Sequence, residues 1–144
     1  MTENSRFYMA VHVLVLLAMF PDELHKSGDI GKSVGVNPVV IRRLLAILRS
    51  AGLVSAKQGA GGGSLLQKDP FAITLAFVYR AVGAGGVLTP HNRNTSKICP
   101  VGKHIHEAMI TIATSVETVV DAALGQVTIG DMVSRIKTMR RTCI

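Results

Sequence analysis

Cysteine and aromatic residues are scarce in this 144-residue sequence, and tryptophan is absent. Its two cysteines, Cys99 and Cys143, lack the spacing of a disulfide framework, which argues against a secreted disulfide-rich domain. The longest apolar run, Met9 to Phe20, is too short to span a bilayer, and its flanks do not resemble those of a signal peptide. Aromatic residues make up 4% of a chain that is 48% hydrophobic, so the core must be aliphatic and helical. We expect one compact cytoplasmic domain with no membrane partner.

Acidic residues are missing from the whole stretch between Ile30 and Lys68, although the chain has nine of them. The net charge of the chain is +7, and its pI is near 9.9. A stretch that carries cationic residues and no acidic ones indicates a surface that binds a polyanion. We expect this partner to be double-stranded DNA. The cations of this stretch are Lys32, Arg42, Arg43, Arg49, Lys57 and Lys68.

The segment from Asn37 to Gly52 has the signals of a helix with defined ends. Asn37 suits the N-cap, Pro38 suits the first helical position, and Gly52 suits a left-handed cap. A helix at 38–51 has a core face formed by Ile41, Leu44, Leu45 and Leu48. Its other face is small and cationic, as a helix in a major groove requires, and carries Val39, Arg42, Arg43, Ala46, Arg49 and Ser50.

Short elements are predicted on both sides of this helix. Ser27 to Val36 is typical of a short helix with a glycine turn, which makes a helix-turn-helix pair. Leu53–Gln58 and Ser64–Gln67 indicate two strands, and the glycines between them let bare backbone approach a phosphate or a minor groove. A hairpin in this position predicts a wing at 57–67.

The helix and the wing are expected to bind DNA by different contacts. Asn37, Val39, Arg42 and Arg43 lie at the end of the helix where side chains reach base edges, and Lys57 and the wing lie on the flanking backbone. The full set of expected DNA-binding residues is Asn37, Val39, Arg42, Arg43, Arg49, Lys57, Gln58, Gly59, Gly61 and Gly62.

The second half of the chain is expected to dimerise. The predicted parts are a short helix at 74–82, a loop at 83–98, a long helix at 100–124 and a last helix at 129–139, after which the end frays. A seam of apolar residues recurs along the long helix at Ile105, Met109, Ile112, Val116, Val119 or Val120, and Ala123. We expect a two-fold homodimer through this seam, with the apolar first helix beside it; the alternative is a core helix folded back on its own domain. The expected boundaries are 1–83 for the DNA-binding region, 84–99 for a loop and 100–144 for the dimerisation helices.

No motif for catalysis is complete. Gly28 to Ser33 looks like part of a phosphate-binding loop, but Lys26 stands where its first glycine is required. Cys99 and His104 could form a nucleophile and base, yet no oxyanion donor or third group accompanies them. We therefore expect no enzyme.

Taken together, these features resemble the Rrf2-type bacterial transcriptional regulators over nearly the whole chain. The likeness is carried by Leu44-Leu45-x-x-Leu48-x-x-Ala51-Gly52-Leu53-Val54, Gly59-x-Gly61-Gly62-Gly63, Ile73-Thr74-Leu75 with Ala81-Val82, Cys99-Pro100-Val101-Gly102, and Thr128-Ile129-Gly130-Asp131-Met132-Val133. The resemblance implies a mainly α winged helix-turn-helix with a β-hairpin wing and a long C-terminal dimerisation helix. It also implies a regulator, expected to be a repressor, that reads an inverted-repeat operator. A winged-helix module that binds protein instead of DNA is the alternative.

Iron is the point at which the sequence departs from several members of this family. Those members hold an iron–sulfur cluster through three closely spaced cysteines, whereas this chain has only Cys99 there. The other candidate ligands are His91, His104, His106, Glu107 and Cys143. Of these, His104 and His106 point to different sides of a helix. The resemblance implies the cluster-free, YwnA-like branch, and no cofactor is expected.

Cys99 is the candidate sensor residue. It precedes Pro100 at the positive end of the long helix, with Lys97, Lys103 and His104 nearby in sequence, and each influence favours a thiolate. One interpretation is a redox, electrophile or iron–sulfur sensor; the other is an inert cap residue, with a small-molecule ligand, if any, in an apolar pocket between helices.

Overall fold

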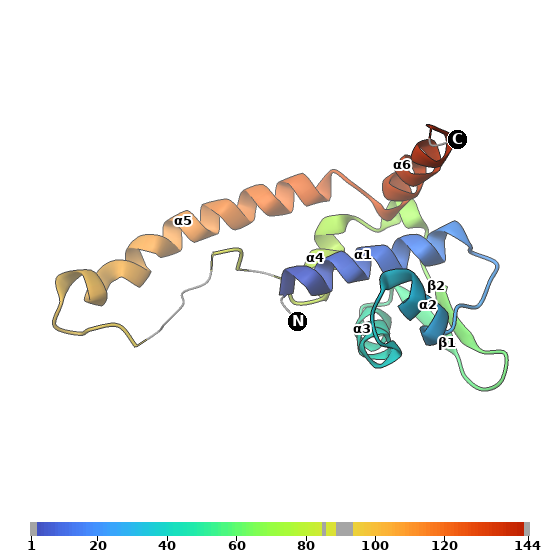
Figure 1. Ribbon diagram of the computed structural model, residues 1–144. Helices are drawn as coiled ribbons and strands as arrows, with labels where there is room; N and C mark the ends of the chain where they lie inside the picture. The colour runs from blue at the N-terminus through green and yellow to red at the C-terminus, as the bar shows by residue number, and fades with distance from the viewer. Residues whose placement is uncertain (1–2, 85, 89–93, 143–144) are drawn as a thin grey trace.

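The protein is a helical head with one long helix that runs away from it, and Figure 1 shows this arrangement in the computed structural model. The structure describes residues 3–84, 86–88 and 94–142. The predicted mainly helical fold with a hairpin is confirmed. In chain order the elements are α1 (Glu3–Met19), α2 (Ser27–Val34), α3 (Pro38–Ser50), β1 (Val54–Lys57), β2 (Gly63–Leu66), the 3-10 turn η1 (Pro70–Ala72), α4 (Leu75–Ala81), α5 (Pro100–Gly125) and α6 (Ile129–Thr142).

The core of the head is aliphatic, and α1 runs through it. Leu14 and Leu17 of α1 are at most 1% exposed, and they belong to the same cluster as Ile30 of α2 and Leu48 of α3. The apolar run of α1 is therefore buried largely within its own chain. Its remaining side is half-buried, and Val11 and Leu16 pack there against the edge of the core.

Helix α3 has the ends that its sequence predicts. The Asn37 side chain accepts a hydrogen bond from the Val39 N–H at 2.9 Å, and Pro38 occupies the first turn. The helix ends at Ser50, one residue before the predicted end, because Ala51 is the cap and Gly52 follows with φ +76°. Ile41, Leu44 and Leu48 are buried, and Leu45 is half-buried, as expected of the core face.

The wing is a two-stranded antiparallel hairpin with one partner that the sequence did not reveal. Val54 pairs with Leu66, and Lys57 pairs with Gly63. His25, in the connection from α1 to α2, forms an isolated bridge to Ser64, with backbone hydrogen bonds of 3.1 and 2.9 Å. The base of the wing is therefore tied to the chain just before α2.

Helix α6 returns to the head and packs on α1. A capping box begins it, since the Thr128 N–H donates to Asp131 Oδ2 at 2.9 Å and the Asp131 N–H donates to Thr128 Oγ1 at 3.0 Å. Ile129 and Val133 enter the core. The helix continues to Thr142, so the predicted fraying after Met139 is wrong; residues 143–144 lie outside the described residues.

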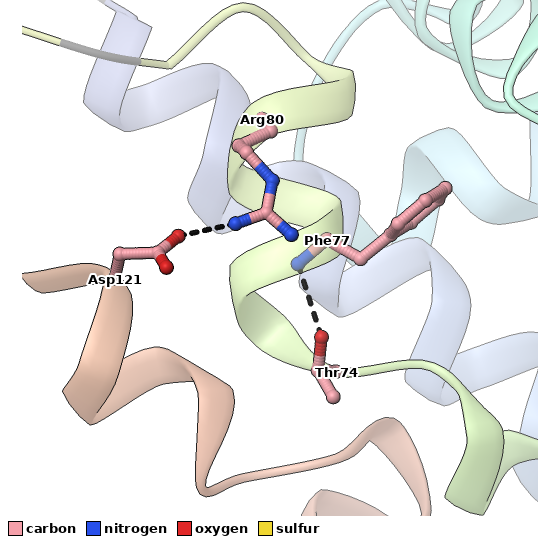
Figure 2. A network of polar contacts seen from close by, with 4 residues as sticks. All are labelled: Thr74, Phe77, Arg80 and Asp121. Carbon is pink, nitrogen blue, oxygen red and sulfur yellow. Dashed lines mark hydrogen bonds and ion pairs between the residues drawn. The ribbon is translucent and has the colours of Figure 1, made fainter.

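Helix α5 forms an arm of 26 residues with no buried residue. It contacts the head near its end, where Arg80 of α4 forms an ion pair with Asp121, and Figure 2 shows this contact beside the Thr74 cap of α4. The alternative of a core helix folded back on its own domain is therefore wrong. Among the described residues, α5 is also the one helix long and apolar enough to cross a membrane, with a mean hydropathy of 1.3.

Candidate DNA-binding surface

A hollow of about 530 Å³ lies between α3, the start of α2 and the wing. Four cations line it, and its described lining residues include no carboxylate. Backbone of the wing glycines forms part of the wall. The lining side chains with polar or charged groups are His25, Lys26, Ser27, Arg42, Arg49, Lys57, Gln58 and Ser64.

The exposed face of α3 supplies one wall of this hollow. Arg42 and Arg49 are two turns apart on the helix, and both line the hollow. The Arg42 Nη1 donates to Ser27 Oγ at 3.4 Å, which turns its guanidinium toward the start of α2. Both arginines are exposed, so their remaining donors are free to meet a ligand.

The turn of the wing depends on glycine backbone. Gly59 and Gly61 have φ of +90° and +75°, which L side chains rarely adopt. A Cβ at Gly62 would lie 2.1 Å from the Lys57 carbonyl oxygen, so this position has no room for a side chain. Gly59 and Gly61 are exposed and have no side chain, so their backbone can approach another molecule closely, whereas Gly62 is buried inside the turn.

Most of the expected DNA-binding residues meet at the hollow, but four lie outside its lining. Arg42, Arg49, Lys57, Gln58, Gly59 and Gly62 are brought together there. Asn37, Val39, Arg43 and Gly61 are exposed but do not line it. The oxygen of Asn37 is already engaged in its cap.

Sequence reasoning missed the residues that the α1–α2 connection contributes to the hollow. His25 and Lys26, followed by Ser27 at the start of α2, line it because the bridge from His25 to Ser64 holds this connection against the wing. The local signal was the cation Lys26 directly before a helix start. Its partner across the bridge is far along the chain, and no pattern near residue 25 reveals it.

Cys99 lies at the start of α5, outside this surface. Its side chain is exposed, and it stands at the N-cap of the helix. Backbone N–H groups of Gly102 and Val101, in that order of effect, lower the pKa of its thiol. The direction of this shift favours a thiolate; its cause is the backbone at the start of α5, and Lys97, Lys103 and His104 are not among its causes.

Comparison with known proteins identifies the family to which this chain belongs. The family model for Rrf2, described as an iron-dependent transcriptional regulator, matches residues 4–135. The chain belongs to the Rrf2 family. It is 37% identical to YwnA of Bacillus subtilis, named as a candidate HTH-type transcriptional regulator, over 92% of this chain and 98% of that protein. A second relative, YwgB of the same organism, is 34% identical over 60% of this chain and 56% of its own.

Solved structures support the winged-helix fold of the family. One described as a candidate DNA-binding protein has a TM-score of 0.69 and 36% identity, and covers 88% of this chain and 97% of its own. CymR of B. subtilis, described as a global cysteine regulator, has a TM-score of 0.63 and 23% identity, with 90% and 94% covered. The IscR structure of T. potens has a TM-score of 0.64 and 23% identity, with 91% and 85% covered.

Iron, which the family description implies, does not fit the donor groups of the described residues. At the start of α5, where the resemblance places cluster ligands, Cys99 is exposed and stands without a second thiol among the residues described. His104 Nδ1 lies 3.8 Å from Glu107 Oε2, a pair within one helix turn. Residues 3–84, 86–88 and 94–142 contain no group of three His, Cys, Asp or Glu that could hold a metal. His91 and Cys143, the other candidates, lie outside these residues.

Proposed function

We propose that this Rrf2-family protein is a dimeric repressor that reads an inverted-repeat operator through α3 and the wing. The cationic hollow between these elements carries the proposal. Its four cations and bare glycine backbone match the phosphates that flank a major groove, and α3 presents a narrow exposed face to the bases. The relatives support this function, because they are named as regulators of transcription. Such regulators are not enzymes. They work in the cytoplasm, where we place this protein.

Two substitutions test whether α3 and the wing make different kinds of contact with DNA. Arg42→Ala should cost about 1–3 kcal/mol of binding free energy if the guanidinium pairs with guanine, and should relax the preference at one position per half-site. Lys57→Ala should weaken binding to all sequences alike and reduce the salt slope by about one unit. Gel shifts at several salt concentrations measure both effects. If the unmodified protein binds no duplex at low salt, the alternative of a protein-interaction module replaces this proposal.

Dimerisation is proposed through the exposed seam of α5. Ile105 and Met109 are each 39% exposed, and Ile112 is 53% exposed, an unfavourable state for apolar side chains of a helix in water. A second apolar surface is a groove of about 470 Å³ between α1 and α6, lined by residues such as Val11, Leu16 and Ile136. In the dimer, the seam of one protomer would cover the groove beside α1 of its partner. This contact would also explain why α5 is long and apolar, without a membrane.

Charge placed in the seam tests the dimer. Ile112→Asp would bury an unpaired carboxylate in the contact, so sedimentation should show a monomer where the unmodified protein is a dimer at micromolar concentration. Thr114→Asp is the matched control, because Thr114 is exposed on the opposite side of α5 and should leave the dimer intact. A monomeric unmodified protein contradicts the proposal.

We also infer that regulation does not require a bound iron–sulfur cluster. The single cysteine at the start of α5 and the lack of a three-ligand group among the described residues support this inference. Protein purified without oxygen should lack the visible absorbance of a cluster, and its DNA affinity should not change with an iron chelator. Stoichiometric iron and sulfide in that preparation would contradict it.

A further inference from the structure

Apolar side chains also line the cationic hollow, which phosphate binding alone does not explain. Ala46 lies between Arg42 and Arg49 on α3, four residues after the first and three before the second. Leu45, Val54 and Ala56 line the same hollow. A surface that met only phosphate oxygens would gain nothing from these methyl groups, because they offer no hydrogen bond or charge to an anion.

The major groove of DNA contains one apolar group that matches such a surface. Among the base edges, only thymine presents a methyl group, and the other exposed groups are hydrogen-bond donors and acceptors. The Ala46 side chain is exposed and short, so a base edge can approach the α3 backbone closely at this point. On either side, the longer Arg42 and Arg49 can reach outward to neighbouring bases or phosphates.

We propose that Ala46 is a specificity-determining residue that reads the C5-methyl group of one thymine in each half-site. The inference rests on the proposed DNA binding and extends it by naming the base chemistry that this apolar lining recognises. Leu45, which is half-buried against the core and also lines the hollow, adds apolar surface beside Ala46. Any larger or polar side chain at position 46 would displace the methyl group or leave it without an apolar partner.

The test begins with an operator selected from random duplexes by the full-length protein. Each thymine of the selected sequence is then replaced by deoxyuridine, which removes only the C5-methyl group. The unmodified protein should lose about fourfold in affinity at one position per half-site, the effect of one buried methyl group. Ala46→Gly should bind the thymine and deoxyuridine duplexes at that position equally.

Two further variants separate base reading from damage to the helix. Ala46→Ser keeps a side chain of similar size without the apolar methyl surface, so it should also lose the fourfold discrimination while avoiding the cost of glycine in a helix. Thr118→Gly is the control for a glycine at an exposed helix position, because Thr118 lies inside α5 and does not line the hollow. It should keep the discrimination unchanged.

The outcomes distinguish this inference from the proposed function. If a sequence is selected but no thymine is sensitive to deoxyuridine, or if the sensitivity persists in both Ala46 variants, the inference is wrong and DNA binding stands. If no sequence is enriched, the proposed DNA binding fails and the thymine contact fails with it.

Discussion

Arg80 of α4 and Asp121 of α5 form the ion pair that joins the arm to the head. Their side chains are 58% and 51% exposed, and Glu117 Oε1, one turn earlier on α5, accepts a hydrogen bond from the Val87 N–H at 2.5 Å. The end of the arm is thus held by these polar contacts together with Val120 and Leu124, which pack against the core. In a dimer that pairs through α5, the direction of the arm would set the spacing of the two heads.

Removing the ion pair should have a small effect on folding. Arg80→Gln and Asp121→Asn should each lower the free energy of unfolding by less than about 1 kcal/mol, because water already solvates both groups. A double-mutant cycle by urea denaturation isolates their coupling, which should decrease as salt is added. A coupling that is large and independent of salt would mean that the pair is buried when the protein dimerises.

The Asn37 cap should contribute to stability independently of DNA. Asn37→Ala should cost about 1 kcal/mol of unfolding free energy, because it leaves the Val39 N–H without its partner. Asn37→Asp keeps an oxygen acceptor and should retain this stability, while its negative charge should weaken binding to DNA. Urea denaturation and gel shifts measure the two effects. If Asp and Ala destabilise equally, the side chain does not cap α3.

The bare turn of the wing should tolerate no side chain at Gly62. Gly62→Ala should displace the turn, because its Cβ would meet the Lys57 carbonyl oxygen at 2.1 Å. We expect reduced DNA affinity and a smaller salt slope, with little change in helical content by circular dichroism. Ala60→Ser, at an exposed neighbouring position, is the control and should bind DNA normally. Unchanged affinity in Gly62→Ala would remove the wing from the binding surface.

Cys99 remains a hypothesis as an oxidant sensor, with an inert cap residue as the alternative. The backbone N–H groups of Gly102 and Val101 lower its thiol pKa. Since the thiolate is the reactive form, iodoacetamide should alkylate Cys99 half-maximally below pH of about 8.5, the value of a free thiol. The measurement uses Cys143→Ser, which leaves Cys99 as the single thiol. A midpoint at or above the free value supports the inert cap. If Cys99 is the sensor, peroxide treatment should abolish DNA binding in the unmodified protein and in Cys143→Ser but not in Cys99→Ser.

The sequence by itself determined the elements whose signals are local. Asn37, Pro38 and Gly52 mark the ends of α3 within a residue, because caps and glycine turns depend on neighbouring backbone groups. The apolar spacing of α3 likewise predicts its buried side, and the glycine run predicts the wing. The family resemblance could be stated for the same reason, since its motifs are short and contiguous.

Only the tertiary structure decided how these elements meet. His25 joins the wing through a bridge to Ser64, and this contact places Lys26 in the hollow opposite α3. Arg80 meets Asp121 across a separation of 41 residues, and α5 leaves the head with Ile105, Met109 and Ile112 of its seam exposed. Periodicity along one helix says which side is apolar but not what covers it. Contacts between distant segments depend on the packing of the whole core, which no local pattern of residues records.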